Sequence, residues 1–413
     1  MSIPAIEQCR SQLKPEYADT IRATLPLVGS NIDKITRHFY KSMFEAHPEL
    51  INNMFNRGNQ RQGAQQRALA ASVATFATVL VNPEADMPDR LLARIGHKHV
   101  SLGVTREQYQ IVHDYLFGAI VAILGADVVT PPVAAAWEDV FWIMANLLID
   151  FEAGLYTNAG VKPGDVFVNT RVLDRKELGG GVVEFVVESK DASKPLPVHQ
   201  PGQYISVGAK LPDGARQLRQ YSLVDAGIKP GQLTFAVKAL EATGQAPAGE
   251  VSNWLIQNVK EGGDLEITLP FGDLVLDQSS NCPVVLISAG IGVTPMLGIL
   301  SHLAGTNSSR ATLSLHADKS SATDVFFEER IQLISRLSSG EAKTWHAEDE
   351  SGSDVLKGRL DLSAIQLPSE AQYYLCGGNE FLQSMRKQLQ ELNVPADRVN
   401  FELFSPNDWL LDV

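Results

Sequence analysis

Three different spacings of apolar residues follow one another along this chain. Up to about residue 157, apolar side chains recur at every third or fourth position, which is the spacing of amphipathic helices. From Asp165, apolar and polar residues alternate, for example at Val183, Phe185 and Val187, and this alternation predicts short antiparallel strands. After Pro283, apolar strands alternate with helical patterns, which predicts a parallel sheet covered by helices. The pattern therefore predicts a multidomain fold: an all-α region, an antiparallel β-barrel and a doubly wound α/β region.

Proline and glycine mark the expected ends of several helices. Pro26 is expected to open a helix, and Gly58 with Asn59 is expected to break another, so that the next one starts near Gln60. Val133–Tyr156 is expected to be the last helix of the first region. In the final region the pattern predicts strands at residues 312–316 and 373–375 and helices at residues 322–337 and 381–392.

The segment Thr157–Gly164 (TNAGVKPG) is rich in glycine and proline and lies where the periodicity changes. We therefore expect a domain boundary at this segment. The expected parts are a helical domain at residues 1–157, a linker at 158–164, a β-barrel at 165–277 and an α/β domain at 278–413.

The composition and net charge of the chain exclude several classes of protein. The chain has 413 residues, of which 44% are hydrophobic and 20% charged, as is ordinary for a globular chain with full cores. Its net charge of −13 argues against nucleic acid or an anionic membrane as the main partner. The N-terminus lacks the pattern of a signal peptide, and the apolar stretch Val140–Ile149 is too short to span a bilayer. The three cysteines are far apart, so we expect a cytoplasmic protein without a disulfide framework.

Candidate chemistry begins at Gly96–Ile111 (GHKHVSLGVTREQYQI). Helical spacing puts Ile95 and His99 on one apolar stripe, whereas His97 faces another side of the helix. A histidine on an apolar stripe is either a packed core residue or a metal ligand. A metal-bound imidazole needs a partner for its other ring nitrogen, and Tyr109, one turn into the next helical pattern, is a candidate for that role.

This stretch resembles the proximal side of a globin, and specifically of the flavohaemoglobins, whose signature is KHxSxGV…QY. The resemblance implies that His99 is the axial ligand of a haem b iron. It also implies a relay in which His99, Tyr109 and Glu152 are hydrogen-bonded, which would strengthen electron donation to the iron. The other interpretation of Glu152 is an exposed residue at a helix end. Lys98 would lie near the contact between haem and flavin.

A second segment resembles the distal side of the same family, through HFYxxMFxxHPEL followed by FNxxNQxxGxQxxAL. It implies that Tyr40, Gln65 and Leu69 line the distal pocket and that Phe55 lies at the haem edge. Tyr40 would donate a hydrogen bond to bound O₂. Considered without the resemblance, Tyr40 is an aromatic residue at the edge of a helix–helix contact.

Three motifs in the β-rich region, PGQY, LRQYSL and GEVSNW, together resemble the ferredoxin–NADP reductase family, which binds FAD on a barrel. Arg219 offers a rigid fork for a pyrophosphate, Tyr221 can stack on the isoalloxazine, and the Ser222 hydroxyl can reach the flavin N5. Ser252 is expected to cap a helix whose start can bind phosphate. The expected FAD-binding residues are Tyr204, Arg219, Gln220, Tyr221, Ser222, Gly249, Val251, Ser252, Phe404, Ser405 and Pro406.

Residues 283–297 (PVVLISAGIGVTPML) form a strand, a glycine turn and a helix by pattern, and GIGVTP resembles the dinucleotide motif of the same reductase family. Cys376, at the end of a later strand, is either a neighbour of the nicotinamide or a buried structural thiol. A 2′-phosphate needs an arginine near the end of the second strand, where this chain has Asp318 and Lys319, so NADH is favoured. The expected NAD(P)-binding residues are Gly290, Ile291, Gly292, Val293, Thr294, Pro295, Cys376 and Gly377.

The resemblance covers nearly the whole chain and implies a nitric oxide dioxygenase. Such an enzyme converts NO and O₂ to nitrate, with electrons passing from NAD(P)H to FAD and then to haem. The expected partners are the small molecules O₂ and NO, with lipid as a further candidate for the distal pocket, and the protein is expected to be a monomer. Two other functions stay open: a haem-linked (lipid) hydroperoxide reductase, and a non-enzymatic O₂ or NO sensor.

Overall fold

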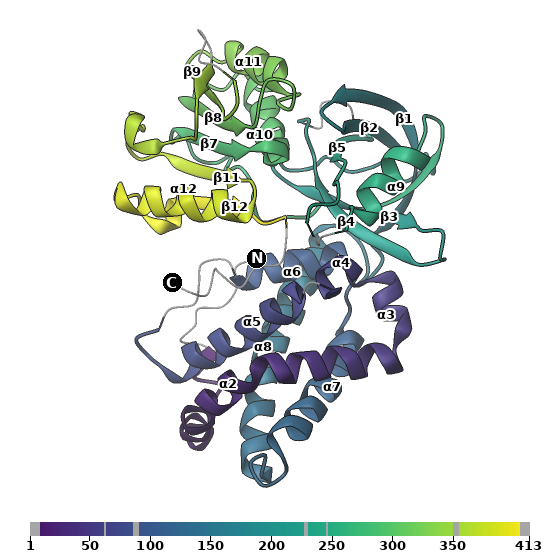
Figure 1. Ribbon diagram of the computed structural model, residues 1–413, viewed down its shortest axis with the longest axis vertical. Helices are drawn as coiled ribbons and strands as arrows, with labels where there is room; N and C mark the ends of the chain where they lie inside the picture. Colours follow the sequence, from purple (N-terminus) through teal and green to yellow (C-terminus); the bar gives the residue numbers. More distant parts are fainter. Residues whose placement is uncertain are drawn as a thin grey trace. The chain divides into compact units, whose positions relative to one another are not determined.

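The computed structural model describes residues 9–61, 63–85, 91–226, 230–244, 247–349 and 355–404. The chain divides into two compact units (Figure 1). The first unit contains the chain up to Val166 together with Pro212–Leu218. The second contains Phe167–Leu211 and the described residues from Arg219 onward. The three predicted architectures are all present, so the predicted fold class is confirmed.

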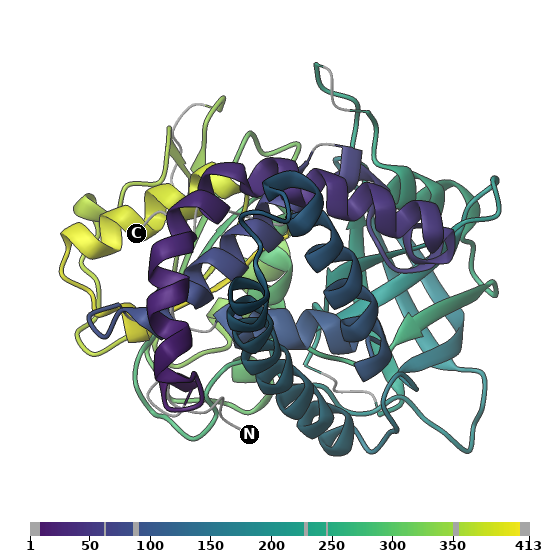
Figure 2. The same cartoon turned by 90° about the horizontal axis from the view of Figure 1, so that it is seen from below.

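Helices form the first unit, and their apolar faces meet in one buried cluster. The longest is packed against several of the others, and Figure 2 shows it among them. The helices are α2 (Pro15–Ala46), α3 (Pro48–Asn53), α4 (Arg57–Arg61), α5 (Ala64–Val81), α6 (Leu91–Ser101), α7 (Arg106–Leu124) and α8 (Pro131–Asn158).

Two expected helix boundaries in this unit are wrong. Pro26 lies inside α2 instead of opening it. Ile21 and Val28 on either side are both buried, and their burial outweighs the roughly 3 kcal/mol that an internal proline costs a helix. Gly58 and Asn59 do not break a helix either. Their backbone N–H groups donate to Asn56 Oδ1 at 2.9 and 3.2 Å, so the Asn56 side chain caps the start of α4.

Helix α8 is 28 residues long, far longer than the apolar stretch noted in the sequence. Among the described helices it is the one that is long and apolar enough to cross a membrane, judged by length and composition alone. Core helices of globular proteins meet the same criterion, and Trp137, Val140 and Leu148 of α8 belong to the buried cluster of this unit.

The second unit begins with a six-stranded antiparallel sheet in the order β4-β3-β6-β1-β2-β5. An antiparallel bridge between Leu223 and Phe235 joins its two edges, so the sheet curls into a barrel. Val183, Phe185 and Val187 point into its core, as their alternation predicts. The elements are β1 (Phe167–Gly179), β2 (Val182–Ser189), β3 (Tyr204–Lys210), β4 (Arg216–Ser222), β5 (Gln232–Lys238), β6 (Asp264–Thr268) and the helix α9 (Glu250–Asn258).

The rest of this unit is a parallel sheet in the order β10-β9-β8-β7-β11-β12. The chain runs outward from β7 in both directions, so β7 marks the switch point where ligands bind in such sheets. The strands are β7 (Val284–Ala289), β8 (Thr312–Asp318), β9 (Gly340–His346), β10 (Val355–Lys357), β11 (Gln372–Cys376) and β12 (Val399–Glu402), and the helices are α10 (Val293–Gly305), α11 (Phe327–Ser335) and α12 (Asn379–Glu391).

Helix α11 begins five residues later than the sequence pattern predicts. The backbone N–H groups of Thr323 and Asp324 both donate to the Ser320 carbonyl, at 3.1 and 3.0 Å. These bonds close a turn before the helix. The turn places Thr323 and Asp324 at the carboxyl edge of the sheet.

Candidate functional site

His99, on α6, is tied to two residues of neighbouring helices. Its Nδ1 lies 2.8 Å from Glu152 Oε1 on α8 and 3.0 Å from the Tyr109 hydroxyl on α7. The Tyr109 hydroxyl also donates to Glu152 Oε1 at 2.6 Å. The structure therefore brings together the three residues that the sequence resemblance grouped.

Local sequence explains this arrangement. Gly103, at φ +74°, turns the chain out of α6, and the side chains of Thr105 and Gln108 form a capping box that starts α7. Tyr109 follows directly, in the first turn of α7. The Tyr156 hydroxyl donates to the Val104 carbonyl at 2.6 Å and fixes the connection between the two helices to α8.

Gly96 is a contributor that the sequence argument missed. A Cβ at this position would lie 2.5 Å from the Phe151 ring, so only glycine allows α6 and α8 to cross this closely. The crossing brings Glu152 within reach of His99. A glycine in the middle of an apolar helical stripe is the signal that could have revealed it.

The charge at this cluster is buried. The Glu152 side chain is 3% exposed, and burial together with the charge of Glu152 raises the pKa of Tyr109. Tyr109 therefore remains a neutral O–H donor. Among the described residues none is hydrogen-bonded to His99 Nε2, and the His99 side chain is 32% exposed. The arrangement leaves one imidazole nitrogen for an external electron-pair acceptor such as a metal ion.

A second polar group lies between α2 and α5. Tyr40 is buried, with its ring 5.6 Å from that of Phe44 and 6.0 Å from that of Phe55. Burial raises the pKa of Tyr40, against a smaller opposite effect of a hydrogen bond with Gln60, so its hydroxyl keeps its proton. Gln60 Nε2 in turn donates to Gln65 Oε1 at 2.9 Å.

Gln60 links Tyr40 to Gln65, and the sequence argument treated it only as a helix start. Its place in a polar cluster around Tyr40 was not visible because α4 was not expected. Leu69 and Phe55 pack on the apolar cluster of this unit, and Lys98 is half-buried beside His99.

The expected FAD-binding residues of the first two reductase motifs lie on β3 and β4. Tyr204 begins β3, and residues 219–222 end β4. Gln220 Nε2 donates to Ser206 Oγ at 3.0 Å, so this side chain braces the barrel. Burial raises the pKa of Tyr221, with a smaller opposite effect of Arg219. The buried Ser222 Oγ has no hydrogen-bond partner among the described residues, which leaves it for a ligand.

The expected cap at Ser252 is wrong. Helix α9 begins at Glu250, and the Gly249 carbonyl already accepts a bond from the Asn253 N–H, so Gly249 is the cap and Ser252 is the third helical residue. A Cβ on Gly249 would lie 2.5 Å from Ser252 Oγ and 2.7 Å from Leu240 Cβ. Glycine is needed because the chain is crowded here. The backbone N–H groups at a helix start are the kind of donors that bind a phosphate.

The glycine turn after β7 is tightly packed against the end of β11. Gly290–Gly292 form a 3₁₀ turn, and α10 follows at Val293. A Cβ on Gly292 would lie 2.4 Å from the Cys376 carbonyl oxygen. Thr294 Oγ1 donates to the Ile291 carbonyl at 2.9 Å, which closes the turn. Burial, and next the charge of Glu402, raises the pKa of Cys376, so its side chain is a neutral thiol.

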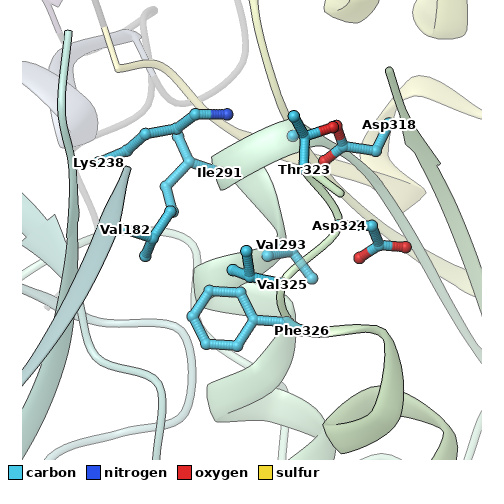
Figure 3. A pocket seen from close by; sticks show the side chains of 10 residues that line it. Val182, Lys238, Ile291, Val293, Asp318, Thr323, Asp324, Val325 and Phe326 are labelled. Carbon is cyan, nitrogen blue, oxygen red and sulfur yellow. The ribbon is translucent and has the colours of Figure 1, made fainter. Parts of the chain in front are cut away.

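A small cleft opens beside this turn, at the switch point of the parallel sheet (Figure 3). It brings together residues of the barrel, the glycine turn and the segment after β8. Lys238, at the end of β5, is one of several lining residues that the sequence argument missed. The lining residues are Val182, Lys238, Gly290, Ile291, Val293, Asp318, Thr323, Asp324, Val325 and Phe326.

Not every expected site residue can be placed in this way. Phe404 is 47% exposed, whereas Ser405, Pro406 and the tail Trp409–Val413 lie outside the described residues. Pro295 and Gly377 are near the glycine turn, in α10 and directly after β11.

Known proteins resemble this chain over almost its full length. The Globin family matches residues 37–147, the oxidoreductase FAD-binding domain residues 169–275, and the oxidoreductase NAD-binding domain residues 286–387. A flavohemoprotein of Deinococcus radiodurans is 39% identical over 408 residues, which is 96% of this chain and 98% of that protein. The chain belongs to the flavohemoproteins.

Two solved structures agree with this family. The crystal structure of a Malassezia yamatoensis flavohemoglobin with bound FAD and haem superposes with a TM-score of 0.86 at 34% identity, covering 95% of this chain and 100% of the other. The FAD/NAD-binding domain of a Vibrio cholerae nitric oxide dioxygenase gives a TM-score of 0.54 at 36% identity, covering 58% of this chain and 99% of the other.

Membership confirms the family predicted from the sequence motifs. This flavohemoprotein is an NAD(P)H-dependent oxidoreductase with an FAD-binding and an NAD-binding domain. The domain limits drawn from the sequence, and the roles of the individual site residues, stay predictions.

Proposed function

We propose that this flavohemoprotein is a nitric oxide dioxygenase, which converts NO and O₂ to nitrate at the expense of NAD(P)H. The observation that carries the proposal is the presence of two polar groups in one helical unit: His99 in contact with Glu152, and the buried Tyr40 near the half-buried Gln65, with Gln60 between them. A reductase unit on the same chain can supply electrons. Conversion of one NO and one O₂ to nitrate consumes one electron, so one hydride supports two turnovers.

The helical unit fits a haem group. His99 Nε2 is available, and its Nδ1 is fixed by Glu152, as metal-bound histidines require. The haem would supply an iron that binds O₂. Tyr40, held neutral by burial, would donate a hydrogen bond to the oxygen atoms, and Gln60 would orient Gln65 in the same region. The apolar side chains of Phe55 and Leu69 would exclude water from the pocket.

The barrel fits FAD, which would accept a hydride and release single electrons. Ser222 Oγ is buried without a partner among the described residues and would bond the flavin ring. Tyr221 would stack on that ring, and Arg219 with backbone N–H groups at the start of α9 would hold the phosphates.

The residues around the cleft at the switch point would bind part of the nicotinamide dinucleotide. Gly290 and Ile291 would lie against it, and Lys238 would face a phosphate. None of the described residues that line the cleft is an arginine, the side chain that a 2′-phosphate requires, so NADH is the proposed donor. The proposed site of action is the cytoplasm, which fits three cysteines that form no disulfide.

The test compares Tyr40→Phe with Tyr115→Phe, a matched change on α7 whose ring contacts His47. NADH-driven consumption of NO in the presence of O₂ should fall about tenfold or more in Tyr40→Phe and stay near wild type in Tyr115→Phe. Nitrate should account for the NO consumed. Wild-type protein that oxidises NADH with a lipid hydroperoxide, but not with NO and O₂, would replace the proposal by the hydroperoxide reductase.

A further inference from the structure

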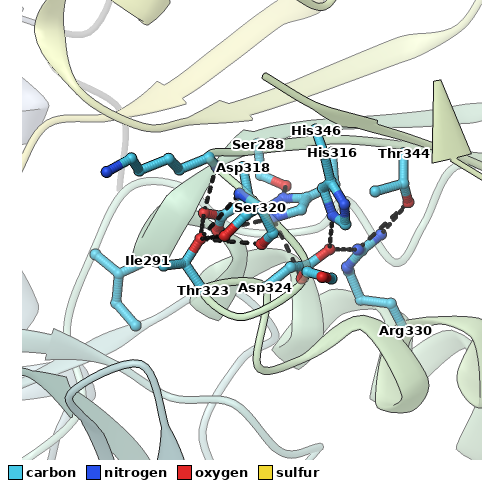
Figure 4. Close-up of polar contacts among 12 residues, drawn as sticks. Ser288, Ile291, His316, Asp318, Ser320, Thr323, Asp324, Arg330, Thr344 and His346 are labelled. Atoms are coloured by element: carbon cyan, nitrogen blue, oxygen red, sulfur yellow. Dashed lines mark hydrogen bonds and ion pairs between the residues drawn. The ribbon is translucent and has the colours of Figure 1, made fainter. Parts of the chain in front are cut away.

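A cluster of buried polar side chains lies at the carboxyl ends of β8 and β9, outside the haem and flavin chemistry proposed above. His316 and Asp318 end β8, Asp324 comes from the turn before α11, and Arg330 lies in α11 (Figure 4). The side chains of His316, Asp324 and Arg330 are each 1% exposed or less, and that of Asp318 is 6% exposed. Buried charges of this kind need compensation.

Three atoms of this cluster point toward one another. His316 Nε2 lies 3.7 Å from Asp318 Oδ2 and 3.6 Å from Asp324 Oδ1, and the three atoms all lie within 4.8 Å of one another. Neither His316 Nε2 nor Asp324 Oδ1 has a hydrogen-bond partner among the described residues, although both are buried. Both atoms therefore face the shared space with hydrogen-bonding capacity that the described residues do not use.

The opposite atom of each side chain is already fixed. His316 Nδ1 is 2.8 Å from Ser288 Oγ, which settles the orientation of the ring. Asp318 Oδ1 accepts bonds from the Thr323 hydroxyl at 2.5 Å and the Lys319 N–H at 2.6 Å.

The Asp324 carboxylate is held in the same way. Its Oδ2 accepts a bond from Arg330 Nη2 at 2.7 Å and lies 3.3 Å from His346 Nε2. Outer partners that hold each ligand and leave one atom free are the usual surroundings of a metal ion in proteins.

We propose that His316, Asp318 and Asp324 bind one divalent cation of the zinc class. Imidazole and carboxylate ligands suit this class, and bonds of 2.0–2.2 Å place tetrahedral ligands about 3.3–3.6 Å apart, close to the spacing between His316 and each carboxylate. A fourth position would be left for water.

The acidic side chains of this cluster favour the binding of a cation. Two carboxylates, those of Asp318 and Asp324, face His316 Nε2 across the shared space. Arg330 forms an ion pair with one of these two carboxylates, that of Asp324. A bound dication would link β8 to the turn at Ser320–Asp324, two residues of which line the dinucleotide cleft.

The test uses the full-length protein carrying its haem and FAD, treated with EDTA and then titrated with Zn²⁺ against a chromophoric chelator. We expect one tightly held zinc per chain. His316→Gln, Asp318→Asn and Asp324→Asn should each weaken zinc binding about tenfold or more. The matched control is Asp349→Asn, because Asp349 bonds His346 Nδ1 but does not face the shared space. It should bind zinc within about threefold of wild type.

Retained FAD and an unchanged melting temperature establish that each variant is folded. If Asp324→Asn unfolds because Arg330 loses its partner, His316→Gln and Asp318→Asn decide the matter. X-ray absorption at the zinc edge should show one imidazole and only oxygen besides it. Wild-type protein that binds no zinc, variants that bind it equally well, or a sulfur ligand would each overturn the proposal. The result is independent of NO turnover, so its failure would leave the proposed function untouched.

Discussion

His99 and His316 are both fixed by a contact at Nδ1, yet their carboxylates lie on opposite sides of the ring. At His99 the carboxylate of Glu152 contacts Nδ1, at 2.8 Å, and Nε2 remains open. At His316 the Nδ1 partner is the Ser288 hydroxyl, and two carboxylates face Nε2. The His99 side chain is 32% exposed, whereas that of His316 is 1% exposed.

The position of the carboxylate decides what each imidazole can do. A carboxylate that contacts Nδ1 strengthens electron donation from Nε2 to a single metal ion. Carboxylates that face Nε2 can bind the same metal ion as the imidazole, so the site suits a dication held by nitrogen and oxygen ligands together. The same side chain can therefore serve a redox-active iron in one unit and a redox-inert cation in the other.

Replacing His99 should have the largest effect. His99→Ala removes the only atom proposed to hold iron, so NO consumption should fall to the uncatalysed background, by about 1000-fold or more. The absorption spectrum should lose the haem band and keep the flavin band. His97→Ala, two residues away on α6, is the control and should keep both bands. A full haem band in His99→Ala would refute the ligand assignment.

Removing the cation that compensates Asp324 should cost stability. Arg330→Met leaves a buried carboxylate without its partner, so the free energy of unfolding of the reductase unit should fall by about 3–5 kcal/mol. Urea unfolding followed by flavin fluorescence measures this loss. Arg336→Met, at an exposed position after α11, should change it by less than about 0.5 kcal/mol. A loss below 1 kcal/mol in Arg330→Met would show that the pair is not needed.

Neutralising Glu152 tests the role of the carboxylate charge in contact with His99 Nδ1. Glu152→Gln preserves the shape and loses the negative charge, so NO turnover should fall about 10- to 100-fold. Resonance Raman spectra of the ferrous protein should show a weaker iron–histidine bond. Glu138→Gln, on the same helix but half-exposed, is the control. Unchanged Raman and turnover values in Glu152→Gln would mean that the charge does not reach the imidazole.

Glu184 shows what happens to a carboxylate that lacks such compensation. Burial, with a further contribution from Glu329, raises its pKa to about 7. The folded state therefore binds this proton more tightly than the unfolded state, so stability is present at pH 5 and is lost as the pH rises through 7. Glu184→Gln should be more stable than wild type by about 1–2 kcal/mol at pH 8 and nearly equal at pH 5. Equal pH profiles in thermal unfolding would contradict this.

The sequence predicted elements where one pattern ran over many residues, and it failed where a single residue was used as a boundary. The period-2 residues of β2 and the apolar face of α8 were predicted correctly because burial imposes those patterns. Pro26 and Ser252 misled because burial of Ile21 and Val28, and crowding at Gly249, outweighed the local signal.

The candidate sites divide in a similar way. His99, Tyr109 and Glu152 could be grouped before the structure because a family signature spans them. The cluster around His316 could not, since it joins Ser288, Asp324 and His346 from separate elements, and no local pattern records that they meet. Gln60 and Lys238 were missed for the same reason: their roles depend on neighbours from other segments.

The most direct test of the proposed function is a balance of reactants in the purified protein, with NADH, O₂ and NO consumption and nitrate formation followed together. We predict that two NO and two O₂ disappear for each NADH and that the nitrogen is recovered as nitrate. NADH oxidation that continues at the same rate without consuming NO, with the electrons recovered as hydrogen peroxide, would contradict the proposed dioxygenase.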